Sequence, residues 1–184
     1  MKVTYKFGCS NPETRMRRTS FESMSCPVAR AADVLGDSWN MLILREAFYG
    51  HTRFDEFIDA LGIASNTLTR RLGELVENGL LEKRLYSEKP PRYEYLVTPK
   101  GLDFRPVLLT LMAWGNKHAT TKRQPVRLID TATGEPVELA LVDAKTGKPI
   151  GPGHKVLRQT AKPGRAEYFA FDGESAEGTA AQGA

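Results

Sequence analysis

Residues 54–98 constrain the fold more than any other stretch, and they read FDEFIDALGIASNTLTRRLGELVENGLLEKRLYSEKPPRYEYLVT. The first eight residues have helical spacing and end at Gly62, and a second amphipathic helix follows after a short turn. After Gly79 the apolar period changes to two, which predicts a β-hairpin with SEKPP between its strands. Two short helices joined by a tight turn form a helix-turn-helix, and a following hairpin makes it a winged helix. We therefore expect a mainly α fold with a small β-hairpin, in the α+β class.

Two further helices are expected before this stretch. Cys26-Pro27 opens the first, because proline suits the first helical position, and Gly36 ends it. Asp37 or Ser38 then caps a second helix, WNMLILREAFYG. Because this second helix is apolar over most of its circumference, we expect it to lie centrally in the core.

A long helix is expected after the hairpin, from Pro99 to about Thr120, with Pro106 kinking or restarting it. Its apolar side chains cover more of its surface than one small domain can bury. They are Leu102, Phe104, Val107, Leu108, Leu109, Leu111, Met112 and Trp114. Packing on the domain's own core is one interpretation. We favour a dimer interface, because an exposed apolar surface of that breadth usually has a partner.

The last third of the chain contains an internal repeat. LIDTATGEPV at residues 128–137 recurs as LVDAKTGKPI at residues 141–150. Asp and Thr-Gly between apolar residues predict a tight turn, so each copy should form a small hairpin in a β-ribbon that packs on the domain or on a partner subunit. The expected organisation is a flexible basic arm, a winged-helix domain, a β-hairpin repeat extension and a disordered tail. Their ranges are 1–24, 25–122, 123–172 and 173–184.

The composition permits a nucleic-acid partner without demanding one, since the formal net charge is +4 over 184 residues. Two cysteines are too few for a disulfide framework, and no apolar run approaches the roughly 18 residues that span a membrane. We expect a cytoplasmic protein with no membrane partner. The three histidines lack metal-ligand spacing, and no phosphate loop or nucleophile elbow is present. The sequence therefore predicts no metal, no cofactor and no enzymatic activity.

The second helix of the helix-turn-helix has one apolar side and one polar side. Its core-facing residues are Leu68, Leu72, Leu75 and Val76. The candidate DNA-contacting residues are Ser65, Asn66, Thr67, Thr69, Arg70 and Arg71, with Ser65 a candidate cap. A DNA-reading helix enters the major groove with its N-terminal residues, where Arg can bind guanine and Asn can bind adenine. Glu74 and Glu77 should lie at the far end, away from the phosphates.

The hairpin tip and its surroundings supply further candidate DNA contacts. Lys89, Arg92 and Tyr93 flank the Pro-Pro turn, where a wing would meet the DNA backbone or minor groove, and Arg53 could bind a phosphate. A basic cluster in the arm, residues 15–18, could follow phosphates or simply be solvated. The alternative function is a winged-helix module for protein–protein interaction without DNA binding, which should expose apolar residues at these positions instead.

From Cys26 to about His118 the sequence resembles the HxlR-type winged-helix transcription regulators. The matching stretches are CPVARAADVLGDSW, MLILRE, RFDEF, LGIASNTLTRRLGELVENGLL, PPRYEYLVTPKG and PVLLTLMAWG. The resemblance implies a homodimeric DNA-binding repressor or activator, in which the first and the long C-terminal helices form the dimer. It also implies that the recognition helix and the wing read a palindromic operator. The family often has Ser at position 64 as the N-cap, and here Ser65 would take over from Ala64.

Cys26 matches a cysteine near the start of many family members, some of which sense oxidants or electrophiles through it. A helix N-terminus favours the thiolate, which reacts faster than the thiol, so Cys26 is a candidate redox sensor. The alternative is a half-buried small hydrophobe at a helix cap. A small-molecule effector of unknown identity between the winged-helix domain and the dimer helices is a further expectation, because it could change the spacing of the recognition helices.

Overall fold

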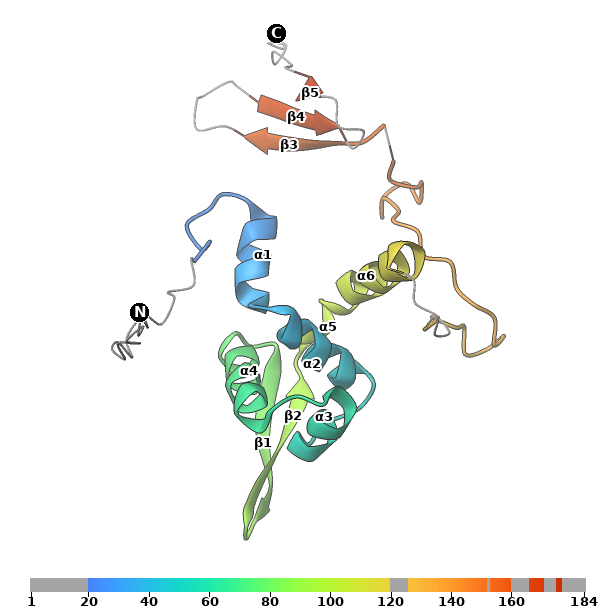
Figure 1. Cartoon of the computed structure of the whole chain (residues 1–184). Helices are drawn as coiled ribbons and strands as arrows, with labels where there is room; N and C mark the ends of the chain where they lie inside the picture. The colour runs from blue at the N-terminus through green and yellow to red at the C-terminus, as the bar shows by residue number, and fades with distance from the viewer. Residues whose placement is uncertain (1–19, 120–125, 152, 160–165, 171–174, 177–184) are drawn as a thin grey trace, which may run out of the picture. The chain divides into compact units, whose positions relative to one another are not determined.

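The computed structural model describes residues 20–119, 126–151, 153–159, 166–170 and 175–176. The chain divides into two units, and the division falls within the last long helix, between Leu111 and Met112. The elements up to that helix are α1 (Pro27–Leu35), α2 (Ser38–Phe48), α3 (Phe54–Leu61), α4 (Ser65–Glu77), β1 (Leu81–Glu88), β2 (Pro91–Val97), α5 (Pro99–Leu102) and α6 (Arg105–His118) (Figure 1). The winged helix-turn-helix predicted from the sequence is confirmed.

The helix boundaries follow from local chemistry. Pro27 is the first residue of α1, and the Asp37 carboxylate caps α2 by accepting a 2.7 Å hydrogen bond from the Trp39 amide. Gly62 ends α3 in the left-handed conformation, with φ of 60°, and its amide donates to the Ile58 carbonyl at 2.8 Å. These two helix starts and this helix end are the ones that the sequence predicted.

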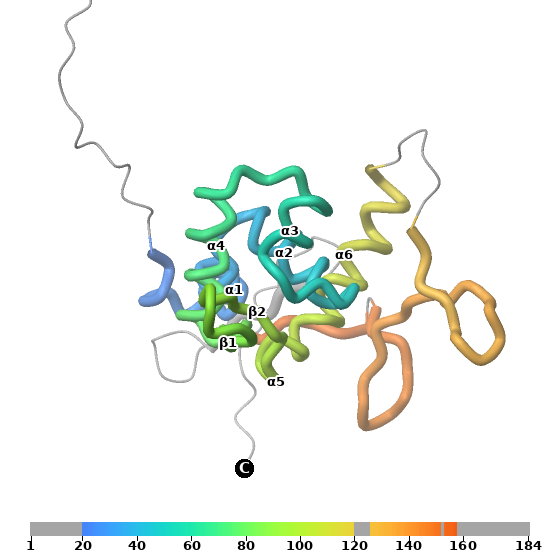
Figure 2. Tube along the Cα trace, turned by 90° about the horizontal axis from the view of Figure 1, so that it is seen from below, coloured from blue at the N-terminus to red at the C-terminus, as the bar shows by residue number. Residues whose placement is uncertain are grey.

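The core of the first unit is built around α2, as its apolar circumference predicted. Ile43 and Leu44 of α2 are fully buried, together with Phe57 of α3. The fully buried leucines of α4 are Leu68, Leu72 and Leu75. Removing each such side chain from water contributes about 1.5–3 kcal/mol, so α4 is held by its apolar face. In both views α3 and α4 join through a short turn beside α2, and α4 lies next to β1 (Figures 1 and 2).

The hairpin is antiparallel and projects beyond the helices, with its tip toward the viewer of Figure 2. Leu81 pairs with Val97 and Leu85 with Tyr93, so alternate residues of the two strands share one face, as the predicted period of two requires. The strands run to Glu88 and Pro91, so the turn is shorter than the predicted SEKPP. The segment before α3 also joins the hairpin, because the Tyr95 amide donates to the Thr52 carbonyl at 2.7 Å.

The predicted long helix is two helices, α5 and α6. Pro106 is the second residue of α6, where the missing amide hydrogen is tolerated, so the predicted restart is confirmed. Thr98 anchors the junction, since its hydroxyl accepts from the Gly101 amide at 3.0 Å and donates to the Gly79 carbonyl at 2.7 Å. Gly101 is buried, and a β-carbon there would lie 2.3 Å from the Leu80 carbonyl oxygen, so only glycine fits.

The first and last helices of this order leave apolar side chains uncovered. Neither α1 nor α6 contains a fully buried residue. Leu35 of α1, Leu108 of α6 and Phe104, the residue before α6, pack partly against the core. The exposed apolar residues are Val28, Val107, Leu111 and Trp114.

The second unit contains the two repeats and a small sheet. Each repeat is a tight turn closed by one isolated bridge, Ile129 with Pro136 and Val142 with Pro149. The regular strands come later as β3 (Lys155–Gln159), β4 (Ala166–Ala170) and β5 (Ser175–Ala176), in the antiparallel order β3-β4-β5. The β-ribbon of the extension is thus formed after the repeats.

Part of the predicted tail is structured, because Ser175–Ala176 pair with β4. Disorder is therefore wrong for these two residues, and the rest of 173–184 lies outside the described residues, as does the arm up to residue 19. Residues 20–24 are described, and the Asp33 carboxylate of α1 accepts hydrogen bonds there from the Ser20 hydroxyl and the Phe21 amide. The boundary near residue 122 stays a prediction. None of the described helices is long and apolar enough to cross a membrane.

Candidate nucleic-acid interface

The N-terminal half of α4 presents a polar surface. Ser65, Asn66, Thr69 and Arg70 are exposed, and Thr67 is half-buried. The Thr69 hydroxyl donates to the Ser65 carbonyl at 2.9 Å, so it is directed back along the helix. Because the opposite side of α4 is buried leucine, the helix can present only this polar face to a partner.

The start of α4 differs from the prediction by one residue. Ala64 occupies the N-cap position with extended backbone, Ser65 is the first helical residue, and no side chain caps the helix. The predicted capping role of Ser65 is therefore wrong. Ile63 is buried at the turn, and this anchor sets where the helix begins. The uncapped amides of the first turn carry partial positive charge and favour an anion such as phosphate.

Arg71 does not lie on the outward face, which corrects its inclusion among the DNA contacts. Its side chain is 10% exposed and forms ion pairs with the carboxylates of Asp37 and Glu74, the latter at 2.8 Å. On the helical wheel Arg71 lies at the border between the apolar and polar faces of α4, so the sequence allowed its side chain to point inward or outward. The Asp37 carboxylate at the N-cap of α2 is the partner that draws this guanidinium inward.

Glu74 connects the buried arginine to an exposed one. Its Oε1 accepts from Arg70 Nη1 at 3.1 Å and its Oε2 from Arg71 Nη1 at 2.8 Å. The Asn40 amide nitrogen lies 3.4 Å from Oε2 and donates to the Leu35 carbonyl at 2.5 Å. Burial opposes ionisation of Glu74, but hydrogen bonds from Arg71 and Asn40 and the charges of both arginines outweigh it, so its pKa is lowered. The predicted position of Glu74 away from the DNA phosphates stays a prediction.

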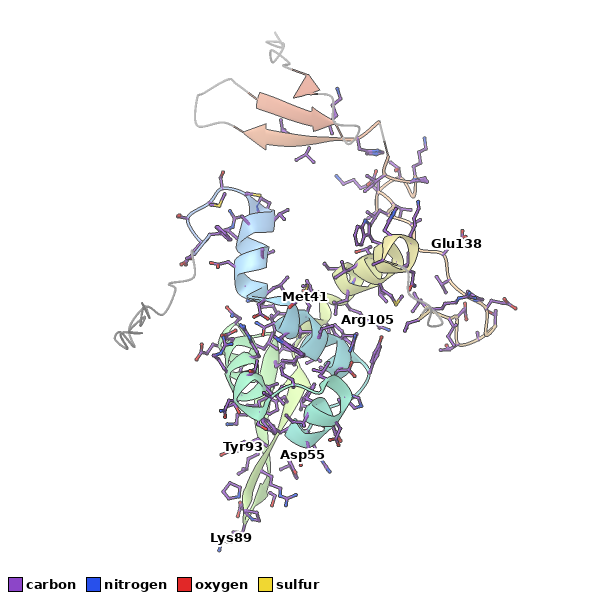
Figure 3. The ribbon with its side chains drawn as sticks, in the orientation of Figure 1. Met41, Asp55, Lys89, Tyr93, Arg105 and Glu138 are labelled. Carbon is purple, nitrogen blue, oxygen red and sulfur yellow. The ribbon has the colours of Figure 1, made fainter. Side chains whose placement is uncertain are left out.

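The hairpin tip carries the predicted basic residues. Lys89 and Arg92 are exposed at the tip, and Tyr93 follows them on β2 (Figure 3). Lys83 contributes another cation, because its Nζ lies 4.0 Å from the centre of the Tyr93 ring. The face of this aromatic ring is therefore occupied by a charge, unlike the bare apolar surface expected of a protein-binding wing.

Arg53 lies where the segment before α3 meets the hairpin, and its guanidinium carbon is 4.8 Å from the centre of the Tyr86 ring. Its backbone amide and that of Thr52 donate to Glu56 Oε2 at 2.9 and 2.8 Å. These bonds lower the pKa of Glu56. The sequence did not reveal Tyr86, because the register shifts between Leu85 and Ser87 and breaks the alternation that would have placed it.

Cys26 is exposed, as a free thiol at the N-cap position of α1, and its side chain makes no capping hydrogen bond. Its redox role stays a prediction. The alternative of a half-buried residue does not fit this exposure. Within the described residues, no three His, Cys, Asp or Glu side chains gather to hold a metal ion.

The helix pair α3–α4, the exposed polar face of α4 and the adjoining hairpin define the class of winged helix-turn-helix proteins. The HxlR-like helix-turn-helix family matches residues 34–123. The uncharacterized HTH-type transcriptional regulator Rv3095 of Mycobacterium tuberculosis is 37% identical over 138 residues, which cover 70% of this chain and 87% of the relative. The regulator sll1512 of Synechocystis is 39% identical over 92 residues, covering 50% and 68%.

Two solved structures are also similar. PA1607, a candidate transcription factor, has a TM-score of 0.67 and 38% identity, covering 78% of this chain and all of that one. The Pseudomonas aeruginosa protein PA1374, described in the same way, has a TM-score of 0.54 and 44% identity, covering 74% and 94%. The chain belongs to the HxlR-type family of helix-turn-helix transcriptional regulators.

Proposed function

We propose that this regulator binds DNA as a homodimer and reads a palindromic operator with α4 in the major groove. The observation that carries the proposal is the exposure of Asn66 and Arg70 on a helix whose opposite face is fixed by buried leucines. A helix held in this way can enter the groove without losing its own packing. Its N-terminal half is the part that contacts base edges in helix-turn-helix proteins.

Each polar residue has a role that its chemistry allows. Arg70 can donate two hydrogen bonds to guanine O6 and N7, and Asn66 can pair with adenine N6 and N7. Ser65, Thr67 and Thr69 can bind phosphates or base edges. Because Arg70 is paired with Glu74 in the free protein, it must exchange this ion pair for the base when it binds.

The hairpin acts as the wing in this proposal. Lys89 and Arg92 at its tip would contact the DNA backbone or the minor groove, with Tyr93 beside them. Arg53 would neutralise a phosphate near the base of the wing while its guanidinium stays over Tyr86. Contacts of this kind set the position of the protein on the duplex and make binding depend on salt.

The dimer is proposed to form through α1 and α6. Val28 of α1 and Val107, Leu111 and Trp114 of α6 are exposed, with Trp114 59% exposed. A two-fold dimer would bury these side chains and place two recognition helices on half-sites about 34 Å apart, one turn of DNA. The palindromic operator follows from that symmetry.

Control by oxidation at Cys26 or by a small effector is part of the same proposal. Cys26 is exposed directly before α1, so a modification there would alter a helix of the proposed dimer interface. We also propose a cytoplasmic location, where a regulator meets DNA. The sign of regulation could be either repression or activation.

The test is a salt titration of binding to the DNA upstream of the protein's own gene, measured by fluorescence anisotropy. The affinity should fall steeply with salt, because bound lysines and arginines release counterions from the duplex. Arg127→Ala removes an exposed arginine that lies outside α1, α4, α6 and the hairpin, and it serves as the charge-matched control for Arg70→Ala. A flat salt response, or no binding, would favour the protein–protein interaction module instead.

A further inference from the structure

The second unit carries exposed aliphatic side chains along residues 126–157. None of the described residues from 126 to 157 is fully buried. The aliphatic side chains that we call the repeat surface are 37–63% exposed, and they are Val126, Ile129, Val137, Leu139, Leu141, Val142, Ile150, Val156 and Leu157. Single exposed aliphatic residues are ordinary, but nine in one short segment are an unusual concentration.

The two repeat turns have the same backbone geometry. The amides of Asp130 and Asp143 donate to the carbonyls of Glu135 and Lys148, both at 2.9 Å. The amides of Gly134 and Gly147 donate back to the aspartate carbonyls, both at 2.8 Å.

The second pair of equivalent bonds is at the base of each turn. The Val137 amide donates to the Leu128 carbonyl and the Ile150 amide to the Leu141 carbonyl, again both at 2.8 Å. The two turns therefore have the same backbone shape, and each has apolar residues at the equivalent positions.

The turns differ in charge at equivalent positions. The first turn has Glu135 where the second has Lys148, and the second also has Lys145 where the first has Ala132. The aspartate carboxylates are engaged within their own turns, since Asp130 accepts from the Ala132 amide at 2.7 Å and Asp143 from the Lys145 amide at 3.0 Å. Glu135 and Lys148 make no ion pair with any described residue.

We propose that the repeat surface binds the repeat surface of a second copy of this chain, with the acidic turn of each copy against the basic turn of the other. In a two-fold dimer a contact from Glu135 to Lys148 occurs twice, because both copies present both turns. Pairing like turns would instead oppose Glu135 to Glu135 and Lys148 to Lys148. The charge difference between otherwise equal turns therefore selects the crossed arrangement.

The size of the surface also fits a second copy. Nine aliphatic side chains about half exposed are an area of the order that each partner contributes to a standard interface, about 800 Å². The contact is separate from the proposed α1 and α6 contact and adds to it. It requires no DNA, so its test is independent of the proposed DNA binding.

The first experiment reverses the charges in the full-length chain and measures self-association by sedimentation equilibrium without DNA. Glu135→Lys and Lys148→Glu should each raise the dimer dissociation constant about tenfold, because each opposes like charges twice per dimer. The double variant should return to within about threefold of the parent. Glu82→Lys, the same change on the exposed face of β1, is the control and should have no effect. Two single variants without effect, or a double variant as weak as the singles, would overturn the proposal.

The second experiment identifies the occupant by cross-linking, in full-length chains with Cys9 and Cys26 changed to serine. Chains with Glu135→Cys, mixed with chains with Lys148→Cys and oxidised, should form a disulfide between the two different chains. Glu82→Cys mixed with Lys148→Cys should not. One chain carrying both Glu135→Cys and Lys148→Cys should link to a second chain, and a purely intrachain disulfide would overturn the proposal.

The apolar part of the surface has its own readout. Leu141 is 63% exposed, so Leu141→Ser should leave the stability of an isolated chain unchanged. If a second copy covers Leu141, the variant should instead raise the dimer dissociation constant about tenfold. An unchanged constant would contradict the proposed interface.

Discussion

Arg71 of α4 forms an ion pair with Asp37, the N-cap residue of α2, across 34 positions of the sequence. Its neighbour Arg70 is 50% exposed and shares Glu74 with it. Two adjacent arginines on one helix thus have different surroundings. Arg71 joins α4 to the start of α2, and Arg70 is available to a partner.

Arg71→Ala should destabilise the fold. The change leaves Asp37 and Glu74 without their buried cation, and because both carboxylates remain about one-third exposed, we expect a loss of about 2 kcal/mol. Urea denaturation followed by circular dichroism measures it. A stability within about 0.5 kcal/mol of the parent would show that the buried ion pair is not structural.

Arg70→Ala should have the opposite profile. The free energy of unfolding should change by no more than about 0.5 kcal/mol, because the Arg70–Glu74 pair is solvent-exposed. Operator affinity should fall by about 1–3 kcal/mol if Arg70 binds a guanine. Anisotropy titrations on operator and on a base-substituted operator measure this loss. Asn66→Ala should behave in the same way, and parental affinity in both variants would place the recognition face elsewhere.

Gly101→Ala should destabilise the α5 junction. The new β-carbon would overlap the Leu80 carbonyl, which is backbone and cannot move aside cheaply, so we expect a loss of about 2–3 kcal/mol. Gly73→Ala is the matched control. Nothing lies near its β-carbon position, and it is within α4, so alanine should stabilise by about 0.5–1 kcal/mol. Thermal and urea unfolding measure both variants. If Gly101→Ala and Gly73→Ala changed the free energy of unfolding equally, this account would be contradicted.

Stability should fall in acid because of Glu74 and Glu56. The folded state lowers the pKa of both carboxyls below their ordinary value of 4.5, so each contributes its full stabilisation above that pH and loses it as the pH falls through its folded pKa. Urea unfolding between pH 3 and pH 7 measures the slope. Glu56→Gln should flatten the acid limb, whereas Asp55→Asn on the same helix turn is the control and should leave it as in the parent.

Cys26→Ser should leave basal operator binding unchanged, since Cys26 lies before α1 and not on α4. If oxidation at Cys26 controls the protein, the same change should abolish any response to diamide or hydrogen peroxide in anisotropy assays. A response that persists in the serine variant would rule out Cys26 as the sensor.

Much of the fold could be predicted because its signals are local. The Asp37 cap, the stop at Gly62 and the restart at Pro106 depend on residues a few positions away, and all three are as the sequence predicted. The strand faces were also predictable, because Leu81 and Leu85 share one parity on the first strand and Tyr93, Tyr95 and Val97 share one on the second. The short turn of the hairpin was not predictable, because the strands continue to pair beyond the residues that show the apolar pattern.

The candidate site was less predictable, since it depends on partners distant in the sequence. The sequence by itself determined an amphipathic α4 with a polar N-terminal half, because helical periodicity is a property of neighbouring residues. Only the tertiary structure decided that Arg71 is internal and Arg70 external, and that Tyr86 lies beside Arg53. A long, flexible arginine side chain at the border of a helix face can point either into the protein or out to solvent. The nearest buried carboxylate, which the fold brings from another helix, decides which direction it takes.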